Sequence, residues 1–168
     1  MERLLTQNTF QGDALAVVVL LIAVVVVAFI TVKIISNYKW SIFRVDRMKG
    51  DEFEDFIKEI YQLLGYKVEK TKKSGDQGID LIIKKHFKRT GIQLKRYKGA
   101  VGNFAVQEAV AGKRFYKLDR ICVLSNTVYT KSAKELAKAN RVELYGREDL
   151  KKLIKKARRR ANGKNRHG

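Results

Sequence analysis

Residues 14–32 limit more than any other feature what this chain can fold into, because these 19 residues carry no charge and are mostly valine, leucine, isoleucine or alanine. A helix of this length measures about 28 Å, which is close to the thickness of the hydrocarbon layer of a bilayer. Valine is a poor helix former in water, but lipid enforces the helix because unpaired backbone groups find no water there. The run therefore predicts one transmembrane helix at residues 14–32, with lipid as its partner, after a short non-cytoplasmic segment at residues 1–13.

The residues after this run indicate the orientation of the chain. Aromatic and cationic side chains follow in the order Lys33, Tyr38, Lys39, Trp40, Arg44, Arg47 and Lys49. Aromatic rings are enriched at the membrane interface, and cations on the cytoplasmic side of a span. We therefore expect a basic juxtamembrane linker at residues 33–49, in a single-pass protein of the cell membrane whose C-terminal domain is cytoplasmic.

Two other interpretations of the apolar run are a cleaved signal peptide and a buried core helix. A signal peptide opens with cations, has a shorter apolar stretch and ends at small residues. This run instead follows a segment of near-zero charge and continues into Lys33 and bulky side chains. A buried helix of that length would be unusual in a chain of 168 residues. These differences favour the membrane anchor.

The charge of the chain is strongly positive and unevenly distributed. Lys and Arg number 36 against 17 Asp and Glu, which gives a formal net charge of +19, and residues 33–168 alone carry +20. Residues 151–168 contain nine cations and no acid, so we expect a basic C-terminal helix and tail there. A field of this sign attracts the phosphates of nucleic acids or of anionic lipids, and for the tail both partners remain open.

Cysteine and histidine are too scarce to build a metal site of their own. The chain has one cysteine, Cys122, and two histidines, His86 and His167. This excludes an intrachain disulfide and a multi-cysteine zinc site, and disfavours a histidine-rich one. Cys122 lies in an apolar run and is expected in the core, whereas His86 is expected at the surface. Any chemistry must rest on carboxylates, amides, lysines and hydroxyls.

The remainder of the chain alternates between helical and strand patterns. Apolar spacing indicates helices at residues 51–64, 103–116, 130–140 and 148–160, and β-branched runs indicate strands at residues 66–71, 79–85, 90–97, 120–124 and 142–145. Asp51 and Glu52 suit the first helix start, Gly65 its stop, and Thr130 a later N-cap. The order α-β-β-β-α-β-α-β-α predicts an α/β domain at residues 50–150, with a mixed central sheet flanked by helices.

Three polar residues on two neighbouring strands form a candidate site. Asp80 follows the turn at residues 74–78, and Gln93 and Lys95 lie on the next strand. Residues two apart on a strand point to the same face, so Gln93 and Lys95 project together and Asp80 can meet them across a hairpin. A carboxylate, an amide oxygen and an ammonium suit Mg²⁺-assisted hydrolysis of a phosphodiester, in which the lysine orients water or stabilises negative charge.

Simpler explanations exist for each of these residues. Asp76 and Asp80 fit the chemistry of a tight turn, and an isolated Gln-x-Lys usually marks a solvated strand face. Asp80 fits the turn explanation poorly if it lies inside a strand, where aspartate is disfavoured. The order and spacing of the residues together favour the site over these explanations.

The motifs around the candidate site resemble those of a known family. They are Gly50-x-x-Phe53-Glu54, Gly65-Tyr66, Ser74-Gly75-Asp76-x-Gly78-Ile79-Asp80-Leu81, Gln93-Leu94-Lys95-Arg96-Tyr97, Val101-Gly102, Val106-Gln107-Glu108, Ser125-Asn126 with Thr130 and Ala133, and Gly146 with Leu150. In this order they resemble the Mrr-type restriction endonuclease domain of the PD-(D/E)xK nuclease superfamily. The resemblance covers about 100 residues, essentially the whole soluble domain, and implies a restriction-endonuclease-like fold.

The resemblance also implies roles for four residues. Asp80 and Gln93 are expected to hold the metal, with Gln93 standing where many relatives have glutamate. Lys95 is expected to be the catalytic lysine, and Glu54 matches the acidic residue that the first helix contributes. The expected cofactor is Mg²⁺, which Mn²⁺ can replace, with no small-molecule cofactor.

These inferences together predict a membrane-anchored, Mg²⁺-dependent DNA endonuclease in restriction or defence against foreign DNA. Its basic surface is expected to hold the DNA backbone through Lys72, Lys73, Arg96, Lys98, Lys113 and Arg114, with Lys84, Lys85 and Arg89 nearby. A homodimer would be needed to cut both strands together. One alternative is a catalytically inactive module that binds DNA or a junction at the membrane, and another is a lipid-binding anchor.

Overall fold

The computed structural model describes residues 2–71 and 77–164, and the side chains of residues 15–71 and 77–163. The chain divides into two compact units, Met1–Lys39 and Trp40–Gly168. The predicted residues Lys72, Lys73, Ser74, Gly75, Asp76 and His167 lie outside the described residues.

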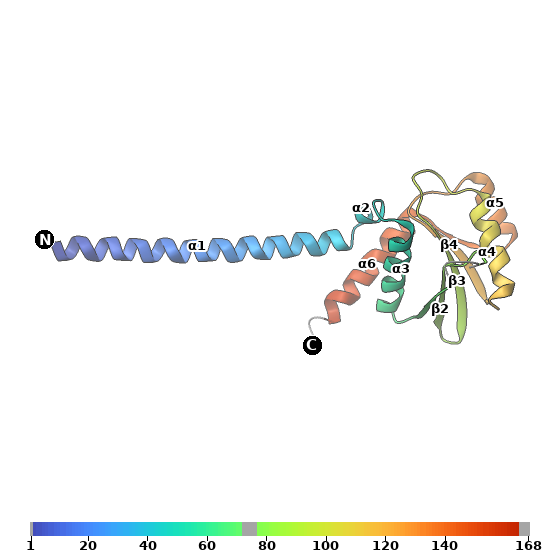
Figure 1. Ribbon diagram of the computed structural model, residues 1–168, viewed down its shortest axis with the longest axis horizontal. Coiled ribbons are helices and arrows are strands. Elements are labelled where there is room, and N and C mark those ends of the chain that lie inside the picture. Colours follow the sequence, from blue (N-terminus) through green and yellow to red (C-terminus); the bar gives the residue numbers. More distant parts are fainter. Residues whose placement is uncertain (1, 72–76, 165–168) are drawn as a thin grey trace. The chain divides into compact units, whose positions relative to one another are not determined.

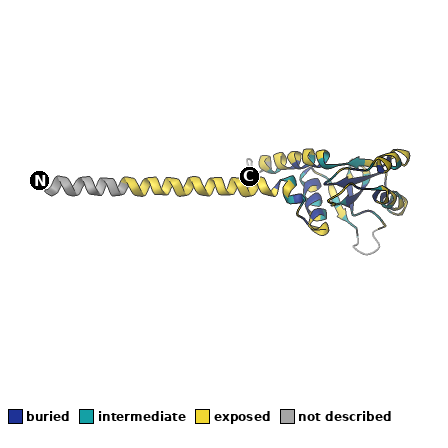
Figure 2. Ribbon diagram, turned by 90° about the horizontal axis from the view of Figure 1, so that it is seen from above, coloured by how far each residue is buried: buried dark blue, intermediate teal, exposed yellow. Residues whose placement is uncertain are grey.

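The first unit is one helix, α1 (Glu2–Lys39), which is longer than the predicted span at residues 14–32. Its segment Leu15–Lys39 is the one helix in the described part of the chain that is long and apolar enough to cross a membrane. Every side chain from Leu15 to Lys39 is exposed (Figure 2), and none belongs to either hydrophobic cluster of the protein. The apolar run is therefore not a buried core helix.

The second unit is built on a mixed five-stranded sheet. Its strands are β1 (Lys67–Lys70), β2 (Leu81–Lys85), β3 (Lys88–Lys95), β4 (Arg120–Ser125) and β5 (Glu143–Tyr145). They lie in sequence order across the sheet. The β1–β2 and β2–β3 pairs are antiparallel, and the β3–β4 and β4–β5 pairs are parallel. The predicted α/β class, mixed sheet and order of elements are confirmed.

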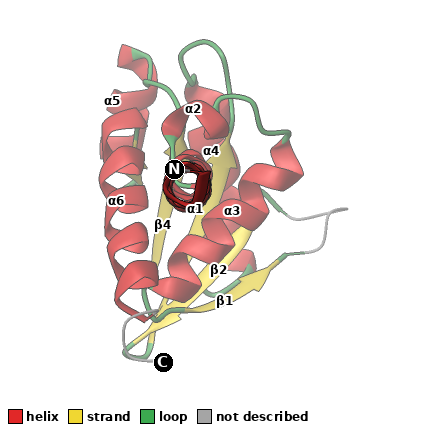
Figure 3. Cartoon of the chain, turned by 90° about the vertical axis from the view of Figure 1, so that its left-hand side faces the viewer, coloured by secondary structure: helices red, strands yellow, loops and turns green. Residues whose placement is uncertain are grey.

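Helices cover both faces of the sheet (Figures 1 and 3). One face packs against α3 (Gly50–Leu63) and α6 (Arg147–Lys164), and the other against α4 (Asn103–Phe115) and α5 (Lys131–Ala139). Successive side chains along a strand point to opposite faces of the sheet, so the sheet separates two hydrophobic cores. Ile92 and Leu94 of β3 point into the α3–α6 core, whereas Ile121 and Val123 of β4 point into the α4–α5 core.

Several local predictions are also confirmed. Asp51 and Glu52 occupy the first turn of α3, and Gly65 just beyond that helix has a φ of +83°. The Thr130 hydroxyl accepts from the backbone N–H of Ala133 at 3.1 Å and so caps α5. Cys122 is 2% exposed, and burial raises the pKa of its thiol, as expected for a core cysteine.

The residues between α1 and α3 are divided differently from the linker expected at residues 33–49. Residues 33–39 belong to α1, and a short helix, α2, spans Ile42–Val45. Trp40, Val45 and Met48 are buried in the α3–α6 core, and the Trp40 ring lies 5.9 Å from that of Phe56. Because bulky apolar side chains interrupt the cations here, this segment is part of the domain.

A polar network fastens this segment to the rest of the domain. The Arg147 guanidinium donates to both carboxylate oxygens of Asp46 at 2.8 Å each. The Asn126 amide donates to Asp46 Oδ1 at 2.9 Å, and its oxygen accepts from the backbone N–H of Tyr97 at 2.9 Å. Hydrogen bonds from the Arg147 guanidinium hold the pKa of the Asp46 carboxyl below its usual range, against the opposing effect of burial.

The depressed pKa of Asp46 predicts an acid-sensitive contribution to stability. A carboxyl whose pKa is lower in the folded chain stabilises the fold above its unfolded pKa of about 3.9, and loses this contribution as pH falls through the folded value. We expect Asp46→Asn to lower the free energy of unfolding by about 1–2 kcal/mol at neutral pH. The difference from wild type should vanish below the folded pKa of Asp46. Thermal unfolding of the full chain in nonionic detergent, followed by circular dichroism across this range, measures it, and a pH-independent difference would contradict it.

Candidate active site

Asp80 lies where β2 and β3 separate. Its backbone N–H donates to the Ile92 carbonyl at 3.0 Å, and its Oδ2 accepts from the backbone N–H of Leu94 at 2.6 Å. The ladder between β2 and β3 begins with the pair Leu81↔Ile92, so Asp80 lies just before it and bonds to the residues on either side of Gln93. The prediction that Asp80 lies inside a strand was wrong by one residue, because β2 begins at Leu81 and Asp80 occupies the bend before it. If β2 began earlier, one of its backbone carbonyls would accept this N–H of β3. Here the Asp80 carboxylate accepts it instead.

Gln93 is a buried polar residue with an unpaired oxygen. Its side chain is 4% exposed, and its Oε1 accepts no hydrogen bond from the part of the chain that the structure describes. A buried amide oxygen without a donor is unfavourable by about 1–3 kcal/mol, so native proteins seldom leave one without a reason. A cation beside this oxygen would supply the missing partner.

Lys95 projects from the end of β3 toward α4. Its Nζ lies 2.6 Å from Oε2 of Glu108, and the side chains of Lys95 and Glu108 are 14% and 25% exposed. The Lys95 carbonyl accepts from the buried Ser125 hydroxyl at 2.6 Å, which fixes the end of the strand. The structure thus brings Lys95 to the same end of the sheet as Asp80 and Gln93, and adds Glu108 to it.

Glu108 had no predicted role, although one signal in the sequence could have indicated it. The neighbouring positions Ala105, Ala109 and Gly112 are small and buried, so they mark the face of α4 that lies against the sheet. An acid on the edge of such a face lies near the strands. In the sequence, Glu108 is notable only as part of the motif Val106-Gln107-Glu108, which resembles the family.

Two glycines bring the segment before Asp80 against α4. Gly78 has a φ of +78°, and a Cβ on it would lie 2.2 Å from the carbonyl oxygen of Glu108. A Cβ on Gly112 would lie 2.6 Å from the carbonyl oxygen of Gln77. Only residues without a side chain allow the two backbones to approach this closely. The contact ties Asp80 and Glu108 into one rigid arrangement.

Glu54 forms an ion pair with Lys70. Its Oε2 lies 3.1 Å from Nζ of Lys70, and the same Nζ lies 2.8 Å from Oδ1 of Asp55. Lys70 pairs with Leu81 across the β1–β2 ladder, so Glu54 is near the Asp80 end of the sheet, on the α3 side. Its participation in the site stays a prediction.

The oxygen donors at this site fit a hard divalent cation. Among the side chains that the structure describes, no three from Asp, Glu, His or Cys form a cluster, so a metal here would have fewer protein ligands than that. Asp80 supplies one carboxylate, and Gln93 supplies one buried oxygen without a donor. Mg²⁺ commonly binds through one or two carboxylates and keeps several waters, so a small donor set of oxygens is compatible with it.

The predicted DNA-contacting cations fall into two groups. Lys98 and Arg114 are exposed and Lys113 is half-buried. Arg96 instead turns inward, where one guanidinium nitrogen donates to the Asp46 carbonyl at 3.4 Å and its Nε is buried. Tyr97, two residues beyond Lys95, is 46% exposed.

Comparison with known proteins identifies relatives of this domain. The restriction endonuclease family Mrr_cat matches residues 45–154. No curated protein matches the chain. The solved structure of AspBHI, a DNA modification-dependent restriction endonuclease, is 16% identical, with a TM-score of 0.51 over 76% of this chain and 35% of that one. This likeness shows that the two share a fold.

Two further solved structures are similar to a lesser degree. The protein of unknown function AF1548 is 16% identical, with a TM-score of 0.49, over 58% of this chain and 62% of that one. MspJI restriction endonuclease, in complex with a 27-mer oligonucleotide, is 16% identical with a TM-score of 0.40, over 62% of this chain and 25% of that one. The present chain therefore spans about a third of AspBHI and about a quarter of MspJI.

Proposed function

Because the chain belongs to the Mrr_cat restriction endonuclease family, we propose that it is an Mg²⁺-dependent DNA endonuclease that acts from a membrane anchor. The observation that carries the proposed chemistry is the arrangement at the end of β3. There the Asp80 carboxylate bonds to the Leu94 N–H, the Gln93 oxygen is buried without a donor, and the Lys95 ammonium is held in place. The family also supports a role in restriction of foreign DNA, by analogy.

Each residue of the site has a distinct proposed task. Asp80 and Gln93 would hold the metal through their oxygens, and Mg²⁺ held there would supply activation of a water and neutralisation of phosphate charge. Lys95 carries an ammonium that can orient the attacking water or stabilise the negative charge that develops on the phosphate. Glu108 is a positioning residue, since its carboxylate holds the Lys95 ammonium at 2.6 Å.

Electrostatics support DNA as the substrate. Residues 33–150 carry a formal net charge of +11, even without the basic tail. Exposed Lys98 and Arg114 can contact the DNA backbone. The exposed ring of Tyr97 beside the site offers a surface on which a base can stack.

The direct test is cleavage of supercoiled plasmid by the purified full chain in nonionic detergent. We expect loss of supercoiled DNA with Mg²⁺, retention of cleavage with Mn²⁺, and no cleavage with a chelator, because Asp80 and Gln93 can do little without the metal. The first product is informative, since nicked circles indicate one site acting alone and immediate linear DNA indicates a dimer. Salt-sensitive DNA retention without cleavage under every metal condition would replace the proposal by a binding module.

The membrane anchor rests on α1. Its apolar side chains from Leu15 onward are exposed, and only a non-aqueous surrounding makes such exposure favourable. The hydroxyl of Thr31 donates to the Val27 carbonyl at 2.8 Å, so this polar group is satisfied within the helix. The basic residues after the helix support a cytoplasmic domain.

Introducing two lysines, Val24→Lys with Ala28→Lys, should release the chain from membranes. Each lysine at the centre of a span opposes insertion by about 2.5–3.5 kcal/mol. After alkaline extraction we expect wild type in the membrane pellet and the variant in the supernatant, as measured by immunoblot. Intact mass spectrometry provides the control for processing. A mature chain that lacks residues 14–32 would identify a cleaved signal peptide and contradict the anchor.

A further inference from the structure

A cavity lies on the face of the sheet that α3 and α6 cover, away from Lys95 and Glu108. Its volume is about 390 Å³, within the range of pockets that hold small molecules. Side chains from α3, β2, β4, β5 and α6 and from the α3–β1 turn line it. Asp80, Gln93, Lys95 and Glu108 are not among them, whereas Lys85, which was predicted to lie near the DNA-contacting cations, lines this cavity.

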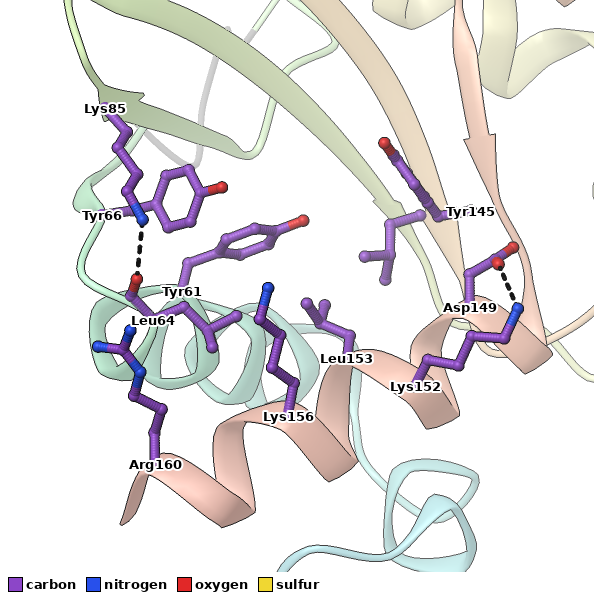
Figure 4. A pocket seen from close by; sticks show the side chains of 11 residues that line it. Tyr61, Leu64, Tyr66, Lys85, Tyr145, Asp149, Lys152, Leu153, Lys156 and Arg160 are labelled. Carbon is purple, nitrogen blue, oxygen red and sulfur yellow. Dashed lines mark hydrogen bonds and ion pairs between the residues drawn. The ribbon is translucent and has the colours of Figure 1, made fainter. Parts of the chain in front are cut away.

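Aromatic rings form two sides of this cavity (Figure 4). Tyr61 and Tyr66 pack edge to face with their ring centroids 5.3 Å apart, and Tyr145 lies across from them. Burial raises the pKa of Tyr61 and of Tyr145, so their hydroxyls stay neutral and do not repel an anion. The rings therefore offer flat, uncharged surfaces that suit a planar ligand.

Four cations and three leucines, Leu64, Leu124 and Leu153, also line the cavity. Lys85 is held in position, because its Nζ lies 4.7 Å from the centre of the Tyr66 ring and donates to the Leu64 carbonyl at 3.3 Å. Lys152, Lys156 and Arg160 follow one another at intervals of four residues and so form one row along α6. Asp149 is the one acid in the lining, and it lies 3.6 Å from Lys152.

We propose that this cavity binds a nucleoside phosphate, with the base between Tyr145 and the Tyr61–Tyr66 pair and the phosphate against the row of cations on α6. Rings beside a row of cations match both halves of such a ligand, since bases stack on aromatic side chains and phosphates pair with Lys and Arg. The site is distinct from the proposed nuclease site, and the proposal stands whether or not the chain cleaves DNA.

Titration calorimetry of the full chain in nonionic detergent, with chelator and without DNA, tests this proposal. The probes are AMP, ATP, adenosine, inorganic triphosphate and glycerol 3-phosphate. We expect AMP and ATP to bind. Adenosine and glycerol 3-phosphate should each bind at least about tenfold more weakly than AMP, and triphosphate at least about tenfold more weakly than ATP. Glycerol 3-phosphate binding as tightly as AMP would point to a lipid headgroup and overturn the proposal, as would triphosphate binding as tightly as ATP.

A matched pair of variants separates a pocket from general charge. Lys156→Ala with Arg160→Ala removes two cations that line the cavity, and should weaken AMP binding at least about tenfold. Lys155→Ala with Arg159→Ala removes the same charge from the same helix, but these residues line a different hollow beside Trp40, so the change should be under about twofold. Equal losses in both variants, or no AMP binding at about 1 mM, would overturn the proposal. Circular dichroism checks that each variant is folded.

Discussion

Replacing Asp80 by asparagine is expected to reduce plasmid cleavage by roughly a thousandfold or more, because the substitution removes the one carboxylate proposed to hold the metal. Lys95→Ala should produce a loss of similar size, since it removes the ammonium proposed to orient the attacking water or to stabilise the negative charge on the phosphate. The measurement is the initial rate of loss of supercoiled DNA at saturating Mg²⁺. DNA affinity at low salt should change little, because the cationic surface remains.

Asp119→Asn provides a matched control for this substitution. The Asp119 carboxylate, like that of Asp80, accepts a backbone N–H from β3, here that of Arg89 at 2.7 Å. It lies at the opposite end of the strand, away from Gln93 and Lys95. Asparagine keeps an oxygen that can accept this N–H but removes the charge, so we expect Asp119→Asn to weaken the same kind of hydrogen bond and to keep its cleavage rate. Equal inactivation by both changes would mean that Asp80 acts only on the fold.

Gly78→Ala is expected to lower the free energy of unfolding more than the addition of a methyl group at any other glycine of the domain. The added carbon would lie 2.2 Å from the Glu108 carbonyl oxygen, on a backbone whose φ of +78° already disfavours a side chain. Strain and overpacking together should lower the free energy of unfolding by about 3 kcal/mol or more. Because α4 must move, Glu108 should leave Lys95 and cleavage should fall as well. Denaturant unfolding and the plasmid assay measure the two effects.

Substitutions at two other glycines distinguish the contribution of backbone strain from that of the steric contact with α4. Gly65→Ala introduces the same backbone strain at a φ of +83° with nothing within 4 Å, and should destabilise by about 1 kcal/mol. Gly99→Ala introduces neither strain nor contact, and should change stability by less than about 0.5 kcal/mol. If Gly78→Ala were no worse than Gly65→Ala, the close approach to α4 would have no energetic importance.

The order of elements could be predicted from sequence because each carries its own local signal. Phe53, Phe56, Ile57 and Ile60 repeat with helical spacing in α3 and are all buried. The strands are short β-branched runs between turn residues, and every helix and strand from residue 50 onward was predicted to within a few residues, whereas α2 was not predicted. The start of β2 was predicted at residue 79, two residues too early, because the separation of β2 from β3 depends on a side chain bonding to the neighbouring strand.

Interactions between distant segments could not be predicted in the same way. Asp46 and Arg147 are far apart in sequence, and nothing local indicates that they pair. Trp40 was assigned to the membrane interface because aromatic residues after an apolar run usually lie there, whereas it is buried beside Phe56. Arg96 was counted with the surface cations, although it turns toward Asp46. Each of these outcomes depends on packing that only the folded chain defines.

The unpaired oxygen of Gln93 has a thermodynamic consequence. In the absence of a ligand the domain tolerates a buried acceptor that a leucine would avoid, and so gives up roughly 1–3 kcal/mol of resistance to unfolding. A cation bound there would restore that difference by mass action, in proportion to the logarithm of its concentration. The proposed site and the stability of the domain are thereby linked, because the buried oxygen that lowers the stability is the same one that is proposed to bind a divalent ion.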